Sequence, residues 1–341
     1  MDPLSQGVVG VAASQLVYTS RKNKVQSGSK FSVAVLGFLS GMAADLDVLI
    51  RSDVDPLLAL EYHRQFTHSL IFIPIGALIC AWFLRSLLFK RSLSFKDAYL
   101  YCFAGYATHA VLDACTTYGT QLFWPFSNTR VAWNNVSVVD PLFTLPLMFL
   151  VLLTVFRRAR LWAILSSVYA FSYLGFGVFQ NHRAQDIALQ VAQSRGHVPL
   201  NLGVKPSFAN LIVWKAVYEH QGRYYVDAIR VAQSTSVIEG SSTEKLNLAK
   251  HFTWLDKGSQ QALDIQRFSW FSNQHLAIDP DDQNRIIDIR YSLIPNRMDG
   301  MWGIVLDANA ASDVHVKWNT TRPNRDEMGE WIDKFWAMIK N

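Results

Sequence analysis

Residues 105–127 read GYATHAVLDACTTYGTQLFWPFS, and this stretch decides how the whole chain is interpreted. Its first part is apolar enough for a membrane helix, yet it contains His109 and Asp113. Side chains four residues apart lie on one face of a helix. Two ionisable groups in apolar surroundings are costly unless a partner compensates them. The sequence therefore predicts a charged or polar partner for this pair.

The apolar residues of the chain are concentrated in its first half. The 341 residues are 50% hydrophobic and only 17% charged. A helical span needs about 20 mostly apolar residues, and such stretches occupy residues 31–50, 69–89, 98–115, 138–156 and 161–179. Residues 4–19 form a shorter stretch, which favours a short or re-entrant helix. We therefore expect a polytopic, all-α membrane bundle of five or six helices over residues 1–180.

The basic residues indicate how the bundle is oriented. They cluster in short loops between the apolar stretches, at Arg21, Lys22, Lys24 and Lys30, at Arg85, Lys90, Arg91 and Lys96, and at Arg157, Arg158 and Arg160. The positive-inside rule places these loops in the cytoplasm, so residues 181–341 are expected outside a bacterial inner membrane. The first basic cluster follows residues 4–19 instead of preceding them, which argues against a signal peptide. Basic residues spread over short loops also give no nucleic-acid-binding face, although the net charge is +5.

Residues 181–341 have the pattern of a small α+β domain. Helical periodicity covers 183–195, alternating or β-branched segments cover 222–233, 285–295, 301–308 and 313–319, and residues 324–341 read as an amphipathic helix. In that last helix we expect one apolar side, formed by Trp331, Ile332, Phe335, Trp336 and Ile339. The abundant Trp and Tyr suit an apolar groove or the membrane interface, and ordinary core packing explains them equally well.

The cysteines are expected to be structural. Cys80, Cys102 and Cys115 all fall in or beside apolar stretches, where cysteine acts as a small buried hydrophobe. The second half contains no cysteine, so it does not depend on disulfides.

Polar residues interrupt the apolar half at three places. Asp45 and Asp47 lie in GMAADLDVLI (41–50), EYHRQFTHSL (61–70) contains two histidines, and His109 with Asp113 forms the third. In the expected topology all three lie toward the outer ends of the helices. Carboxylates and imidazoles without thiolates suit zinc or another divalent first-row metal, whose charge offsets the burial of the acids. The sequence therefore predicts a metal site in which His109 and Asp113 donate from one helical face and Asp47 and His68 could complete a four-ligand shell.

The individual roles within this set stay open. Asp45 and Asp47 are two residues apart and point in different directions, so one is expected to bind metal and the other to orient a ligand or water. The same choice applies to His63 and His68. Arg64 is either a phosphate clamp or a loop arginine at the lipid headgroups. The residues Thr116, Thr117 and Tyr118 either line the site or form the turn before Gly119.

The segments DLD, HRQFTHSL and HAVLDACTTYGTQLFWPF, in this order, resemble the YdjM-like family of bacterial inner-membrane proteins. The resemblance covers about residues 1–180 and implies a metal-dependent hydrolase. The metal-site residues that it implies are Asp45, Asp47, His63, His68, His109 and Asp113. Family members commonly carry a histidine in a TH pair near the N-terminus, where this chain has Ser5 and Gln6. That departure puts a second metal ion in doubt, so one or two ions are expected. The helical His-x-x-x-Asp of His109 and Asp113 is also similar to an element of zinc-dependent phospholipase C.

The leading hypothesis is a membrane-embedded hydrolase. A divalent metal, with zinc expected first, would activate a water to attack an ester or phosphoester of a lipid or lipid-linked substrate. Asp45 or His63 would accept the proton, and Arg64 would hold the phosphate. One alternative is an ion- or proton-coupled transporter that uses the same acids and histidines. Another is a non-catalytic, metal-stabilised membrane anchor for the C-terminal domain.

Overall fold

The computed structural model describes residues 1–21, 29–90, 92–157, 160–320 and 325–340. The described residues divide into two compact units. The helical unit comprises Met1–Leu49, Tyr62–Phe179 and Phe208–Asn210, and the C-terminal unit comprises Ile50–Glu61, Gln180–Ser207 and Leu211–Asn341. Four residues of the predicted basic loops lie outside the described residues, namely Lys22, Lys24, Arg91 and Arg158.

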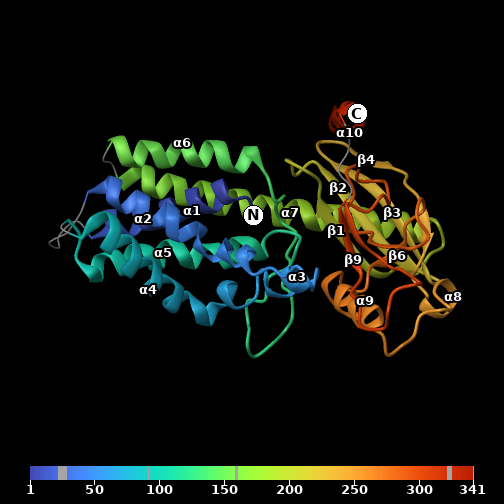
Figure 1. The fold of residues 1–341 in the computed structure, drawn as a ribbon. Coiled ribbons are helices and arrows are strands. Elements are labelled where there is room, and N and C mark those ends of the chain that lie inside the picture. The colour runs from blue at the N-terminus through green and yellow to red at the C-terminus, as the bar shows by residue number, and fades with distance from the viewer. Residues whose placement is uncertain (22–28, 91, 158–159, 321–324, 341) are drawn as a thin grey trace. The chain divides into compact units, whose positions relative to one another are not determined.

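The helical unit consists of helices that run alongside one another (Figure 1). Its long helices are α1 (Pro3–Ser20), α2 (Lys30–Met42), α4 (Ile73–Leu84), α5 (Phe95–Ala114), α6 (Pro141–Arg157) and the first part of α7 (Arg160–Ser194). Short helical turns connect or extend them, namely η1 (Ala43–Leu49), η2 (Phe66–His68), η3 (Leu70–Phe72) and η4 (Arg85–Phe89). The predicted helical first half is confirmed.

Among the described residues, three helical stretches are long and apolar enough to cross a membrane, namely Lys30–Leu49, Leu70–Phe89 and Arg160–Ser194. They coincide with three of the predicted spans. Helix α6 is apolar but shorter. Helix α5 is not among the three, because polar residues such as His109 and Asp113 lower its hydropathy. The number of spans and their orientation stay predictions.

Small residues let α1, α2 and α5 approach closely. A Cβ atom on Gly10 of α1 would lie 2.3 Å from the carbonyl oxygen of Gly37 in α2. A Cβ on Gly105 of α5 would lie 2.7 Å from the same oxygen. Close backbone approach at small residues is a common way to pack membrane helices. It brings the N-terminal end of α1 against the C-terminal end of α5, where the predicted polar residues lie.

Helix α7 is longer than the sequence suggested. The predicted span 161–179 and the separate helical segment 183–195 form one continuous helix of 35 residues. No proline or glycine interrupts residues 178–195, and the turn at Gly196 follows, with a φ of +71° that glycine adopts easily. The chain passes from the helical unit into the C-terminal unit within this helix.

The C-terminal unit contains two antiparallel sheets among its described residues. The first has the order β1 (Leu200–Pro206), β2 (Val213–His220), β3 (Arg223–Val231), β4 (Thr235–Ile238), with β5 (Ser242–Glu244) also paired to β3. The second has the order β6 (Leu276–Ile278), β7 (Arg285–Asp288), β8 (Trp302–Val305), β9 (Lys317–Thr320). The helices of the unit are α3 (Leu58–Tyr62), α8 (Leu248–His251), α9 (Gln260–Phe271) and α10 (Arg325–Lys340), with Tyr62 itself assigned to the helical unit.

The predicted strands and closing helix are present, with differences in extent. Strands β3, β7 and β8 fall inside the predicted segments, although β7 is much shorter than 285–295, and β9 extends one residue beyond 313–319. Only part of the predicted apolar side of α10 is buried. Phe335 is buried, and Trp331 and Ile339 pack in the core, but Ile332 and Trp336 are 40% and 54% exposed. Met338 of the same helix is buried in this core instead, so the buried face of α10 differs from the predicted apolar side.

Candidate metal centre

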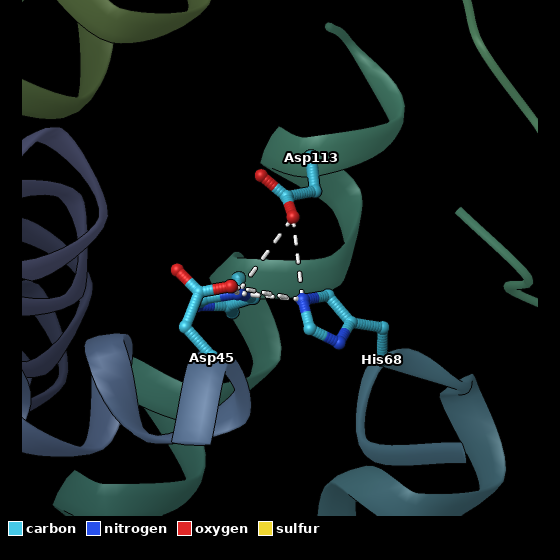
Figure 2. A group of neighbouring side chains, drawn as sticks. Asp45, His68 and Asp113 are labelled. Atoms are coloured by element: carbon cyan, nitrogen blue, oxygen red, sulfur yellow. Dashed lines mark hydrogen bonds and ion pairs between the residues drawn. The ribbon is translucent and has the colours of Figure 1, made fainter. Parts of the chain in front are cut away.

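The three polar interruptions of the sequence meet at one place in the helical unit. Asp45 lies in η1 at the end of α2, His68 ends η2, and His109 and Asp113 lie on the last turns of α5. Figure 2 shows the side chains of Asp45, His68 and Asp113 pointing toward one another. The predicted Asp/His cluster is therefore present.

Four side chains form a group that could hold a metal ion: Asp45, His68, His109 and Asp113 each offer one ligand atom, and these atoms lie within 4.8 Å of one another. The Nε2 atoms of His68 and His109 are 2.9 Å apart. Asp45 Oδ1 lies 3.4 and 3.3 Å from these two nitrogens, and Asp113 Oδ2 lies 3.3 and 3.8 Å from them. His68, His109 and Asp113 are fully buried, whereas the Asp45 side chain is 21% exposed.

Hydrogen bonds on the far side of each ring fix the two imidazoles. His109 Nδ1 lies 2.5 Å from the carbonyl oxygen of Gly41, which can only accept, so Nδ1 carries the proton. His68 Nδ1 lies 3.2 Å from the Asp47 carboxylate and 3.0 Å from the Thr67 hydroxyl. Neutral rings held in this way direct two Nε2 lone pairs at each other. A shared proton or a cation between the two nitrogens would relieve this arrangement.

Two kinds of occupant fit between the rings: a proton and a metal ion. His68 lies just before the apolar stretch Leu70–Phe89. Burial lowers the pKa of His68, but hydrogen bonds with Asp113, Asp45 and Asp47 outweigh this effect and raise its pKa to about 10. Asp113 Oδ2 is buried and lies 3.0 Å from Arg64 Nε and 3.3 Å from His68 Nε2, so it faces the centre of the cluster. The donor set, two imidazoles and two carboxylates, fits a divalent first-row metal.

The structure separates the two neighbouring aspartates: Asp45, and not the expected Asp47, joins His68, His109 and Asp113 in the four-residue group. Asp47 Oδ2 accepts from the Arg64 amide (3.0 Å) and the Thr67 hydroxyl (2.7 Å), and Asp47 Oδ1 lies 2.7 Å from His63 Nδ1. Asp47 is thus surrounded by donors, and its contacts orient His63 and His68. Asp45, Asp47 and His63 also form a second group whose atoms lie within 4.8 Å of one another. An ion there would compete with the hydrogen bonds that Asp47 already makes.

Arg64 lies within the cluster and not at the protein surface. Its side chain is 5% exposed, its Nε lies 3.0 Å from Asp113 Oδ2, and its Nη1 donates to the Thr116 hydroxyl at 3.0 Å. The guanidinium also lies 5.3 Å from the centre of the Tyr118 ring. Arg64 has a φ of +65°, an uncommon conformation for a residue with a side chain. Thr116 and Tyr118, two of the three residues expected either to line the site or to form the turn, therefore contact Arg64.

Sequence reasoning missed the contribution of α1. Gln6 Nε2 donates to Asp113 Oδ1 at 2.6 Å, and the Met1 amine contacts the same oxygen. Gln6 occupies the place where the resembling family carries its TH histidine. That departure was the available signal, but the sequence could not show that α1 reaches Asp113. The close packing of α1 on α5 makes the contact possible.

These features define a helical membrane protein with a buried cluster of aspartate and histidine at one end of its bundle. The chain belongs to the YdjM inner membrane protein family, whose model matches residues 1–184. It is also similar to the uncharacterized protein YfhP of Bacillus subtilis (strain 168), at 24% identity over 141 residues, which are 41% of this chain. The match covers 42% of YfhP. No solved structure matches the chain.

Proposed function

We propose that the chain is a membrane-embedded, metal-dependent hydrolase. The ion, with zinc expected first, would be held by Asp45, His68, His109 and Asp113. The observation that carries this proposal is the pair of facing Nε2 atoms, 2.9 Å apart, with two carboxylates beside them. The packing of apolar helices does not require buried carboxylates and imidazoles. A bound dication would offset the cost of burying the two carboxylates.

A bound divalent ion supplies Lewis-acid activation of a water molecule and of the scissile group. His63 is suited to accept the proton from the water. Its side chain is 34% exposed, and its Nδ1 faces the Asp47 carboxylate, which leaves Nε2 as the basic nitrogen. A carboxylate behind an imidazole also stabilises the protonated ring. Asp45, at 21% exposure, lies on the same accessible side of the cluster.

Arg64 supports an ester of an acidic group as the substrate, with a phosphoester as the first choice. Its guanidinium is buried beside Asp113 and would add positive charge where an anion has to be held. Membership of an inner-membrane family makes a lipid or lipid-linked compound the expected source of that ester.

Metal analysis of the purified protein tests the site. We expect about one ion or more per chain in the wild type and loss of that ion in His109→Ala and Asp113→Ala. Asp97→Asn is the matched control, because Asp97 is a buried carboxylate on the same helix that pairs with Arg21. Unchanged metal content in both the His109→Ala and the Asp113→Ala variants would contradict the proposed metal site.

Two further measurements separate the competing functions. Proton or ion flux in liposomes by protein without a transition metal would support the transporter and contradict the hydrolase. The non-catalytic anchor would be supported by two results together. Metal-loaded protein would cleave none of a panel of phospholipids and lipid-linked phosphoesters, and the Asp47→Ala and His68→Ala variants would retain the biological activity.

A further inference from the structure

A short segment of the membrane half belongs to the C-terminal unit. Residues 50–61, here called the insert segment, lie in sequence between the Asp45–Asp47 turn and His63. They nevertheless form part of the same compact unit as residues 211–341. Both of their chain neighbours belong to the helical unit and carry residues of the candidate metal centre.

One guanidinium holds the insert segment. Arg267 of α9 makes a two-pronged ion pair with Asp55, with Nη1–Oδ1 and Nη2–Oδ2 distances of 2.9 and 2.7 Å. Its Nε donates to Glu61 Oε1 at 2.5 Å. The side chains of Arg267, Asp55 and Glu61 are only 21%, 22% and 34% exposed. Two-pronged, charge-assisted contacts of this kind fix geometry as well as adding stability.

Arg267 is itself fixed from behind. Its Nη1 also donates to Asp264 Oδ1 at 2.9 Å, and Asp264 is fully buried. The other oxygen of Asp264 accepts from His315 Nδ1 at 2.9 Å and from the Val316 amide at 3.1 Å. The position of the guanidinium is therefore set by α9 and by the segment that precedes β9.

The two carboxylates lie at the two ends of α3. Asp55 accepts from the Leu57 amide at 3.0 Å just before the helix, and Leu57 is 1% exposed. Glu61 lies on the last turn of the helix, which spans Leu58–Tyr62. His63 follows directly and contacts Asp47, and the Arg64 amide donates to the same aspartate. Only one residue separates Glu61 from His63.

We propose that Arg267 is a positioning residue for the candidate metal centre. By holding Asp55 and Glu61 it fixes α3, and through α3 it sets where His63 and Arg64 lie. The C-terminal unit would thus act on the site through a covalently continuous segment. This inference rests on the proposed metal site for its functional consequence, but the placement of the segment can be measured without any metal.

Hydrogen exchange and metal release in the full-length protein test this role together. Arg267→Ala leaves three carboxylates without their shared cation, so we expect the amides of residues 57–65 to exchange about tenfold faster or more. We also expect faster transfer of the metal to a chelator. Arg267→Lys, which keeps the charge but loses the fork, should be intermediate. Lys250→Ala is the control, because it removes an exposed ion pair with Glu244 in the same unit.

The outcomes separate the two proposals. Unchanged exchange at residues 57–65 in Arg267→Ala would overturn the positioning role, whatever the metal does. Faster exchange with an unchanged rate of metal release would show that the segment is held without any effect on the centre, which also overturns the inference. A wild-type protein that binds no metal would contradict the proposed function, while the exchange of residues 57–65 would still report on Arg267.

Discussion

The Asp47 carboxylate contacts the Arg64 amide, the Thr67 hydroxyl and the rings of two histidines, and these contacts define its role. A carboxylate behind a metal-binding imidazole fixes the ring and raises its basicity. From the sequence, Asp45 and Asp47 could be recognised as a pair with divided roles, but not assigned. The assignment depends on the 3-10 turn Ala43–Leu49, whose tighter geometry directs Asp45 to the cluster, and no residue pattern signals that turn.

We expect Asp47→Asn to weaken metal binding by roughly 10- to 100-fold without abolishing it, because the variant keeps the four proposed ligands and loses only their support. Competition with a fluorescent chelator measures the affinity. Asp45→Asn should have a larger effect, since it replaces a proposed ligand atom. Equal affinities for wild type and Asp47→Asn would mean that Asp47 does not orient His68.

Lys215 gives a pH prediction for the C-terminal unit. Burial lowers the pKa of Lys215 to about 7, although Asp299 and Asp288 partly oppose this effect. The unfolded chain keeps the proton up to a pKa of about 10.4. Between these values the unfolded state binds more protons, so the free energy of unfolding rises with pH by on the order of 1 kcal/mol per unit. Below pH 7 both states are protonated and the penalty is constant.

Exchange of the β2 amides, corrected for the intrinsic effect of pH, measures this dependence. Lys215→Met should flatten the rise between pH 7 and 9, whereas Lys250→Met should not, because Lys250 is exposed. Buried Lys205, whose pKa burial also lowers, contributes in the same direction and leaves a residual slope. A slope of the wild-type size in Lys215→Met would contradict this assignment.

At the scale of helices, the crossing of α1, α2 and α5 carries the cluster. A Cβ on Gly37 would lie 2.6 Å from Ser14 Oγ and 2.7 Å from the Gly10 carbonyl oxygen. We expect Gly37→Ala to destabilise the helical unit by about 1–3 kcal/mol, because backbone atoms cannot yield as a side chain can. Thermal unfolding in detergent measures the change.

Gly175 supplies the matched control for this prediction. It also lies in a helix, α7, but no atom of the described residues lies within 4 Å of the place that an added methyl group would occupy. Gly175→Ala should therefore be neutral or stabilising by up to about 1 kcal/mol, the gain in helix propensity. If the two variants unfold at the same temperature, the close crossing does not exist.

Strand β2, which sequence reasoning missed, has a physical reason for being hard to recognise. Strand β2 is buried along nearly its whole length, including Lys215 and Glu219, so apolar and polar residues do not alternate along it. Its neighbour β3 alternates more visibly and was predicted. The hairpin between them turns at Gln221 and Gly222, with φ values of 50° and 71°. A strand covered on both faces, such as β2, offers no alternation for the pattern rules to detect.

At the scale of the whole molecule, the sequence showed an apolar half followed by an α+β half, and the structure has that order. It could not show that the insert segment belongs to the second half. The contacts that place it there join residues 206 and 212 positions apart, from Arg267 to Glu61 and to Asp55. The sequence pattern of a polar loop between two apolar stretches does not differ between a loop exposed to solvent and a loop bound by an arginine far away in the sequence.

The orientation of the chain in the membrane is the prediction with the widest consequences. Basic residues that flank the spans, such as Arg21, Lys30 and Lys90, place those loops in the cytoplasm and residues 181–341 outside. Alkaline phosphatase fused after residue 341 should then be active, and a green fluorescent protein fused there should be dark. The reverse pattern would place the C-terminal unit in the cytoplasm. The Asp45 end of α2 would then face the cytoplasm as well, because it lies opposite the basic Lys30 end, and an ester of the outer leaflet could not be the substrate.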